Sequence, residues 1–131
     1  MTDVEEGGDP ACWAHLFEDD GVVAADLTAL LAASGDGVHW TLERDSELNA
    51  NLVRLEPGHV VGQHTNDEVD VVLLVLAGRG HVVLDTTTVT LTPNVVVHLP
   101  KGVARAIHAA PDGLAYLTVH RRRGGLAIGR R

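Results

Sequence analysis

The sequence has one cysteine, Cys12, and two serines, Ser34 and Ser46. A lone cysteine cannot form a disulfide within the chain, which fits a reducing compartment. Neither serine has a plausible base near it in sequence, and the chain lacks the G-x-S-x-G, G-x-x-x-x-G-K-[ST] and H-E-x-x-H motifs. Aromatic residues make up only 3% of the chain, so Val, Leu and Ala supply most of its 45% hydrophobic content. This composition favours β-strands and gives no sign of a nucleophilic enzyme.

Positive charge is also scarce, because the formal net charge is −8. Nucleic acid is therefore not expected as the main partner, since phosphate binding needs a basic surface. The basic run at residues 121–123 and the closing Arg130 and Arg131 are expected to be solvated, with an anion-binding role as the alternative. The longest apolar run, residues 71–77, is too short for a bilayer, and the N-terminus is acidic where a signal peptide would be basic. We expect a cytoplasmic protein with no membrane partner.

The chain of 131 residues has room for one domain. Residues 1–20 are expected to be disordered or extended, residues 21–123 to form the domain with an N-terminal extension, and residues 124–131 to form a basic tail. Within the extension, residues 26–33 predict a short helix, with Asp26 as its N-cap and residues 34–37 as its stop signal.

From residue 38 onward, short apolar segments alternate with turn-forming residues, which is typical of an all-β sandwich or barrel. Residues 78–80 and 111–113 are among the expected turns, because both contain glycine and the second also contains proline. The expected strands are residues 38–43, 48–55, 69–76, 81–85, 89–91, 95–99 and 114–120.

One of these segments, residues 71–76, is apolar at every position. Such a strand must be covered on both faces, by a second sheet, a helix or another subunit, which favours a homodimer. The expected core comprises Leu48, Leu52, Leu55, residues 69–76, Val82, Leu84, Val89, Leu91, Val95, Val97, Leu99, Leu117 and Val119.

The spacing of Gly58, His64 and Gly78 resembles the first cupin motif, G-x5-H-x-H-x3-4-E-x6-G. Residues 94–105 resemble the second, G-x5-P-x-G-x2-H-x3-N, with Asn94 in place of its glycine. The resemblance covers roughly residues 48–120. The resemblance implies an all-β, cupin-type antiparallel β-barrel or jelly roll with a short N-terminal helix.

Cupins use two histidines and a glutamate from the first motif and a histidine from the second to hold a transition metal. The matching positions here are His64, Asn66, either Val71 or Asp70 depending on the register, and Arg105. Only His64 is a certain match. The resemblance therefore implies a cupin that lacks the usual metal ligands, and we expect no cofactor.

Arg105 is the most informative departure, because a guanidinium is permanently charged and cannot bind a metal. Pointing inward, it would place positive charge near the family's metal position, where it could pair with Asp70 or Glu68 or bind a carboxylate. Pointing outward, it would be solvated. The expected binding site is His64, Asn66, Asp70 and Arg105, holding a small and possibly anionic molecule, although His64 could instead be purely structural.

Two other hypotheses stay open, and no catalytic residue is assigned. In a continuous strand Asn66, Glu68 and Asp70 would share one face, so a rebuilt centre of His64, Glu68 and Asp70 could bind a divalent transition metal for oxygenase or isomerase chemistry. Alternatively, the barrel is packed shut and dimerisation is its purpose.

Overall fold

The computed structural model describes residues 15–17, 22–42 and 47–122. Most of the segment predicted to be disordered or extended, and the whole predicted tail at 124–131, lie outside the described residues. Within the described part, no helix is long and apolar enough to cross a membrane.

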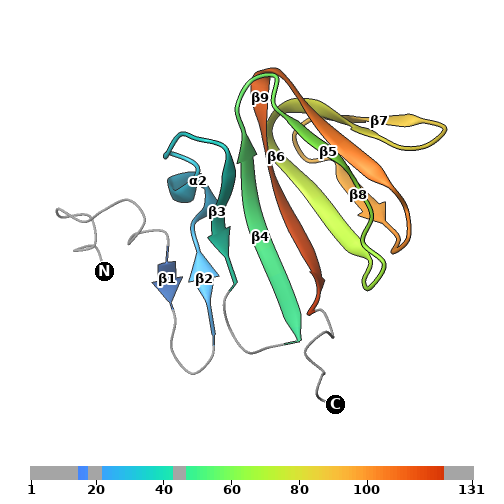
Figure 1. Ribbon diagram of the computed structural model, residues 1–131. Helices are drawn as coiled ribbons and strands as arrows, with labels where there is room; N and C mark the ends of the chain where they lie inside the picture. Colours follow the sequence, from blue (N-terminus) through green and yellow to red (C-terminus); the bar gives the residue numbers. More distant parts are fainter. Residues whose placement is uncertain (1–14, 18–21, 43–46, 123–131) are drawn as a thin grey trace.

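Two long antiparallel strands, β6 (Val71–Val83) and β9 (Arg105–Arg121), pair along most of their lengths and organise the fold. They belong to one seven-stranded sheet, and their halves lie in its two layers, which we call the first and the second sheet (Figure 1). The first half of β6 and the second half of β9 lie in one sheet with β3 (Gly37–Thr41), β4 (Leu48–Leu55) and β8 (Val96–Leu99). The other halves lie in a second sheet with β5 (Val60–His64) and β7 (Thr88–Leu91). The predicted antiparallel jelly roll is confirmed, although the sheet is open and does not close into a barrel.

The two long strands bend from one sheet to the other at a corner of glycines. Gly78 has a φ of 77°, and the pairing register of β6 and β9 shifts between Gly78 and Gly80. A Cβ added at Gly78 would lie 2.2 Å from the carbonyl oxygen of Gly113, so the backbones touch where no side chain would fit. The prediction of turns at 78–80 and 111–113 was therefore wrong. The glycines permit a bulge and a close backbone approach inside continuous strands.

The same error divided β6 into two expected strands and shortened β9. Residues 69–76 and 81–85 were predicted separately, whereas β6 runs unbroken from Val71 to Val83. Strand β5 was missed altogether. Its residues are mostly exposed and include Gly62, so they lack the alternation of apolar and polar residues that predicts a strand.

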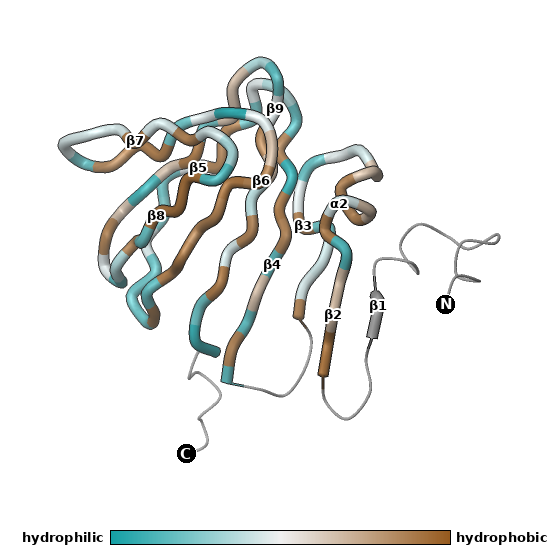
Figure 2. The backbone as a smooth tube through the Cα atoms, turned by 180° about the vertical axis from the view of Figure 1, so that it is seen from behind, coloured by the Kyte–Doolittle hydropathy of each residue, from teal (hydrophilic) through white to brown (hydrophobic). Residues whose placement is uncertain are grey.

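The main core lies between the two sheets, and Figure 2 shows hydrophobic residues along β6 and β8. In β6, Val71, Leu73 and Val75 point into this core. The outward-facing Val72 is 41% exposed, so its prediction as a core residue was wrong, as was that of Leu48, which is 54% exposed. The buried members are Leu55, Val69, Val71, Leu73, Val75, Val82, Leu91, Val97, Leu99, Ile107, Ala109, Leu114 and Tyr116.

A smaller cluster covers part of the outer face of the first sheet. Helix α2 (Leu27–Leu30) begins at the predicted N-cap, where the carboxylate of Asp26 accepts hydrogen bonds from the backbone N–H groups of Thr28 and Ala29. The helix is shorter than predicted, since its C-cap is Leu31. Leu30 packs with Leu52 on the outer face of β4. The strands β1 (His15–Phe17) and β2 (Ala24–Ala25) form a separate two-stranded sheet.

Candidate functional site

Arg105 is the first residue of β9 and pairs with His64, the last residue of β5. Ile107 and Ala109 follow on the same face of β9, and both belong to the core. Arg105 therefore begins a row of inward-facing side chains, and it is only 4% exposed. Its Nη1 donates a hydrogen bond to the carbonyl oxygen of Val103 at 3.0 Å. Of the two orientations considered for Arg105, the structure has the inward one.

Asn66 organises the loop that joins β5 to β6. Its Oδ1 accepts hydrogen bonds from the backbone N–H groups of Glu68, at 2.9 Å, and Val69, at 3.2 Å. This side-chain turn ends the extended backbone, so residues 65–70 are not a strand. The predicted alternation was wrong for this reason: Asn66 is buried, whereas Glu68 and Asp70 are exposed.

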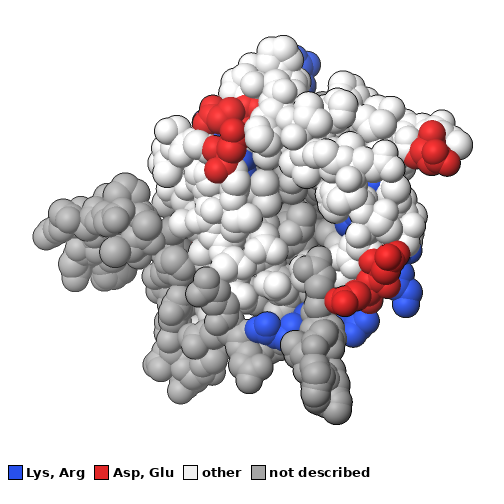
Figure 3. Space-filling view, viewed as in Figure 1, with Lys and Arg blue, Asp and Glu red and all other residues white. Residues whose placement is uncertain are grey.

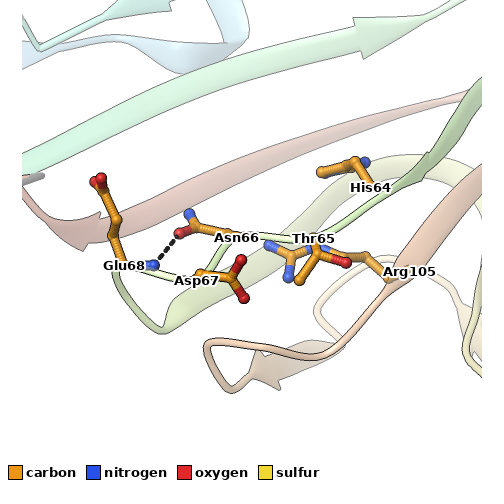
Figure 4. Close-up of a pocket in the computed structure, with 6 residues that line it drawn as sticks. All are labelled: His64, Thr65, Asn66, Asp67, Glu68 and Arg105. Atoms are coloured by element: carbon orange, nitrogen blue, oxygen red, sulfur yellow. Dashed lines mark hydrogen bonds between the residues drawn. The ribbon is translucent and has the colours of Figure 1, made fainter.

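The loop and Arg105 enclose an open pocket of about 390 Å³. In Figure 4 the guanidinium of Arg105 extends toward Thr65 and Asn66, and the carboxylate of Asp67 points to the same side, whereas the carboxylate of Glu68 points away toward the other end of the loop. The pocket thus combines one permanent cation with two carboxylates. Its lining residues are His64, Thr65, Asn66, Asp67, Glu68 and Arg105.

His64 stands at the exposed side of this pocket. Its Nδ1 lies 3.0 Å from the carbonyl oxygen of Gly62, to which it donates a hydrogen bond. A carbonyl only accepts, so the proton of the neutral ring belongs on Nδ1, which makes Nε2 the acceptor nitrogen. His64 therefore offers a ligand either an acceptor or, when protonated, a second donor.

Asp70 does not line the pocket of Arg105. Its carboxylate accepts a hydrogen bond from the backbone N–H of Lys101 at 2.9 Å and another from Nε2 of His98 at 3.0 Å. The hydrogen bond from Lys101, followed by that from His98, lowers the pKa of Asp70. These contacts fasten the loop after β8 to the start of β6, and they draw Asp70 away from the other predicted site residues.

The structure places the residues at the family's metal positions in different surroundings. Val71 is buried in the row of β6 that faces the core, Arg105 is a cation, and Asn66 engages its oxygen with two backbone N–H groups. His64 is left as the one good donor. Across the part of the chain that the structure describes, no group of three His, Cys, Asp or Glu side chains is placed to hold a metal ion. The predicted alternative set of His64, Glu68 and Asp70 is thus not brought together.

Thr65 and Asp67 line the pocket but were not predicted as site residues. Both flank Asn66 in the sequence, and this position next to a motif residue could have identified them as site residues. They were missed because the segment was expected to be a strand, in which only every second residue faces the same side. Surface charge does not help to locate the site, because the charged side chains on the face shown in Figure 3 form small separate groups of either sign.

Two antiparallel sheets sharing two long strands, with the pocket at the start of the last strand, define a jelly roll of the cupin type. The chain belongs to the cupin family, since residues 51–120 match the family model for the cupin domain. It is 29% identical over 89 residues to the uncharacterized protein SCO3923 of Streptomyces coelicolor, a match that covers 66% of this chain and 82% of the relative.

Two solved structures support the fold. A cupin-2 domain containing protein from Shewanella frigidimarina superposes with a TM-score of 0.62 at 16% identity, covering 73% of this chain and 91% of its own. The cupin domain of Cnp3 from Schizosaccharomyces pombe has a TM-score of 0.62 at 14% identity, covering 74% of each chain. At such identities the similarity concerns the fold alone.

Proposed function

We propose that this cupin binds a small organic acid in the pocket of His64, Asn66 and Arg105. The observation that carries the proposal is the buried, inward-facing Arg105 at a position where the family has a metal-binding histidine. A guanidinium keeps its charge at any physiological pH and can donate two parallel hydrogen bonds to one carboxylate. The positive charge that a metal would supply to a ligand is here supplied by a side chain.

The remaining lining residues narrow the ligand class. Asp67 and Glu68 accept hydrogen bonds and would repel a ligand carrying several negative charges. A molecule with one carboxylate for Arg105 and hydroxyl groups for the carboxylates of Asp67 and Glu68 matches both kinds of charged lining group. The volume of about 390 Å³ lies toward the lower end of the range for small-molecule pockets. We therefore favour a monocarboxylic hydroxy acid, bound without metal and without turnover.

The test compares gluconate with its uncharged analogue sorbitol by isothermal titration calorimetry on the full chain. We expect gluconate to bind at least about tenfold more tightly, which is 1.4 kcal/mol. The His64→Ala and Arg105→Gln variants should weaken gluconate binding, whereas Arg79→Gln, which removes an exposed guanidinium outside the pocket, should not. Because Arg105 is buried, circular dichroism must first establish that its variant folds. The exposed His64 provides a substitution that does not disturb the core. Equal affinity for gluconate and sorbitol, or no binding of either, contradicts the proposal.

Metal content separates this proposal from the enzymatic alternative. Untagged protein purified without chelators should contain far less than one transition metal per chain by mass spectrometry. Near-stoichiometric metal that disappears in His64→Ala would contradict the proposal and favour a rebuilt centre that also recruits Glu68 and Asp70. On the basis of the single cysteine, Cys12, we place this binding function in the reducing cytoplasm.

A further inference from the structure

The side-chain amide of Asn66 carries a hydrogen-bond donor that no described residue accepts. Asn66 is only 9% exposed, and its Nδ2 is buried without a hydrogen-bond partner in the described part of the chain. Buried polar groups almost always have a partner, so each exception calls for a reason. Within the same part of the chain, Nε of Arg54 is the other buried side-chain atom without such a partner, and it faces the carboxylate of Glu56 at 3.9 Å. Of these two residues, Asn66 is the one that lines the proposed binding pocket.

The backbone around Asn66 fixes the direction in which this amide faces. Backbone N–H groups only donate, so the atom that faces those of Glu68 and Val69, at 2.9 and 3.2 Å, is the oxygen Oδ1. The nitrogen is therefore turned to the other side. The backbone carbonyl of Asn66 also accepts the N–H of Gly102 at 2.7 Å, which anchors the residue to a second loop. A donor held in place in this way loses little conformational freedom when a ligand accepts its hydrogen bond.

This donor lies beside the cationic group of the pocket. In Figure 4 the amide nitrogen of Asn66 points to the side of the loop on which the ring of His64 lies, and the guanidinium of Arg105 reaches toward Asn66. The guanidinium can hold both oxygens of one carboxylate through two parallel N–H groups. The amide next to it then meets the part of the ligand that adjoins the carboxylate, and there it needs an oxygen as acceptor.

We propose that Asn66 determines specificity by donating a hydrogen bond to a hydroxyl on the carbon next to the carboxylate, which makes the ligand a 2-hydroxy acid. This inference rests on the proposed function and specifies where on the ligand one hydroxyl stands. A ligand without that oxygen leaves the amide buried and unpaired, and sites built to bind a hydroxyl reject the analogue that lacks it for this reason. The proton of the same hydroxyl can be donated to a carboxylate that lines the pocket, that of Asp67 or Glu68.

Isothermal titration calorimetry of the full chain with gluconate, 2-deoxygluconate and sorbitol tests this inference. 2-Deoxygluconate keeps the carboxylate and lacks only the hydroxyl on the adjacent carbon, so the wild type should bind it at least about tenfold more weakly than gluconate. Asn66→Asp retains an acceptor for the two backbone N–H groups but has no N–H of its own, so it should abolish this preference. Its added negative charge weakens both acids, which makes the ratio of their affinities the quantity to compare. Asn51→Asp is the matched control and should preserve the ratio, because Asn51 lies outside the pocket, where its Oδ1 accepts the hydroxyl of Thr41 at 2.6 Å.

The outcomes separate this inference from the proposed function. If the wild type binds gluconate and 2-deoxygluconate equally, and both more tightly than sorbitol, the role of Asn66 is overturned and the carboxylate site stands. Equal affinity for gluconate and sorbitol contradicts the proposed function, and this inference with it. A preference for gluconate that persists in Asn66→Asp also overturns the role of Asn66. If that variant fails to fold, nuclear magnetic resonance of the wild type decides: the side-chain amide signals of Asn66 should shift far more at saturation with gluconate than with 2-deoxygluconate, and equal shifts contradict the inference.

Discussion

The corner between the two sheets should be the least tolerant place in the fold for a single added methyl group. At Gly78, a new Cβ meets the carbonyl oxygen of Gly113 at 2.2 Å and the Cα of Leu114 at 2.9 Å. Both are backbone atoms, so relief requires the strands themselves to separate. Gly78→Ala also places a side chain at a φ of 77°, in the left-handed region.

Substitutions at two other glycines measure the backbone strain and the steric clash separately. Gly58 also has a φ of 77°, but no atom lies within 4 Å of an added Cβ, so Gly58→Ala should cost only the backbone term of about 1–2 kcal/mol. Gly80 does not need a left-handed backbone, yet its added Cβ would lie 2.3 Å from the carbonyl oxygen of His108. Gly80→Ala should therefore cost the overpacking term of about 1–3 kcal/mol. Gly78→Ala combines both terms, at about 2–5 kcal/mol.

Urea unfolding followed by tryptophan fluorescence measures these differences as free energies of unfolding. A domain of this size has only about 5–15 kcal/mol of stability, so Gly78→Ala should lower the transition midpoint strongly. The reasoning fails if Gly78→Ala is no more destabilised than Gly58→Ala. That result would mean that the corner opens at little cost and that close approach of β6 to β9 is not what requires glycine there.

Two predictions concern protonation. The pKa of Asp70 is lowered by its hydrogen bonds from Lys101 and His98, so its contribution to stability is complete above its ordinary pKa and is lost as pH falls through the lowered value. Nuclear magnetic resonance titration should show this carboxylate titrating below its ordinary value, and a normal value would contradict the two contacts. Burial raises the pKa of Tyr116 to about 12, so stability should be full below its ordinary pKa of about 10 and fall as pH rises above it. Tyr116 is the only tyrosine, so tyrosinate absorbance reports it alone, and a midpoint near 10 in folded protein would refute its burial.

The sequence predicted the fold class better than it predicted the course of the strands. Short apolar segments between turn-forming residues predicted β4, β7 and β8, and Asp26 was recognised as an N-cap because capping is a local interaction. The glycines at the corner were misread because a turn and a bulge use the same residue. Only the partner strand, which is distant in sequence, distinguishes a turn from a bulge. Position 78 must be glycine because the backbone of Gly113, far along the chain, lies against it.

The candidate site could be predicted only as far as motif spacing extends. Spacing placed His64, Asn66 and Arg105 together, and the structure has all three around one pocket. Motif spacing did not reveal where the side chain of Asp70 points, because that depends on hydrogen bonds from His98 on β8 and from Lys101 in the loop after β8. It also left Thr65 and Asp67 unnoticed, because a loop presents consecutive residues to a pocket where a strand presents every second one.

Asn66 and Arg105 stand at positions where the family has histidines, and each has contacts or charge that suit its own side chain. The oxygen of Asn66 is held by the N–H groups of Glu68 and Val69, and the carbonyl of Asn66 accepts the N–H of Gly102 at 2.7 Å, so one residue joins the loops of both motifs. A histidine there has at most one acceptor nitrogen and would not reproduce this pair of contacts as readily. A metal next to Arg105 would in turn face a fixed positive charge. The proposed anion site uses Asn66 and Arg105 as they stand, whereas the family's own set of metal ligands would need both of them replaced.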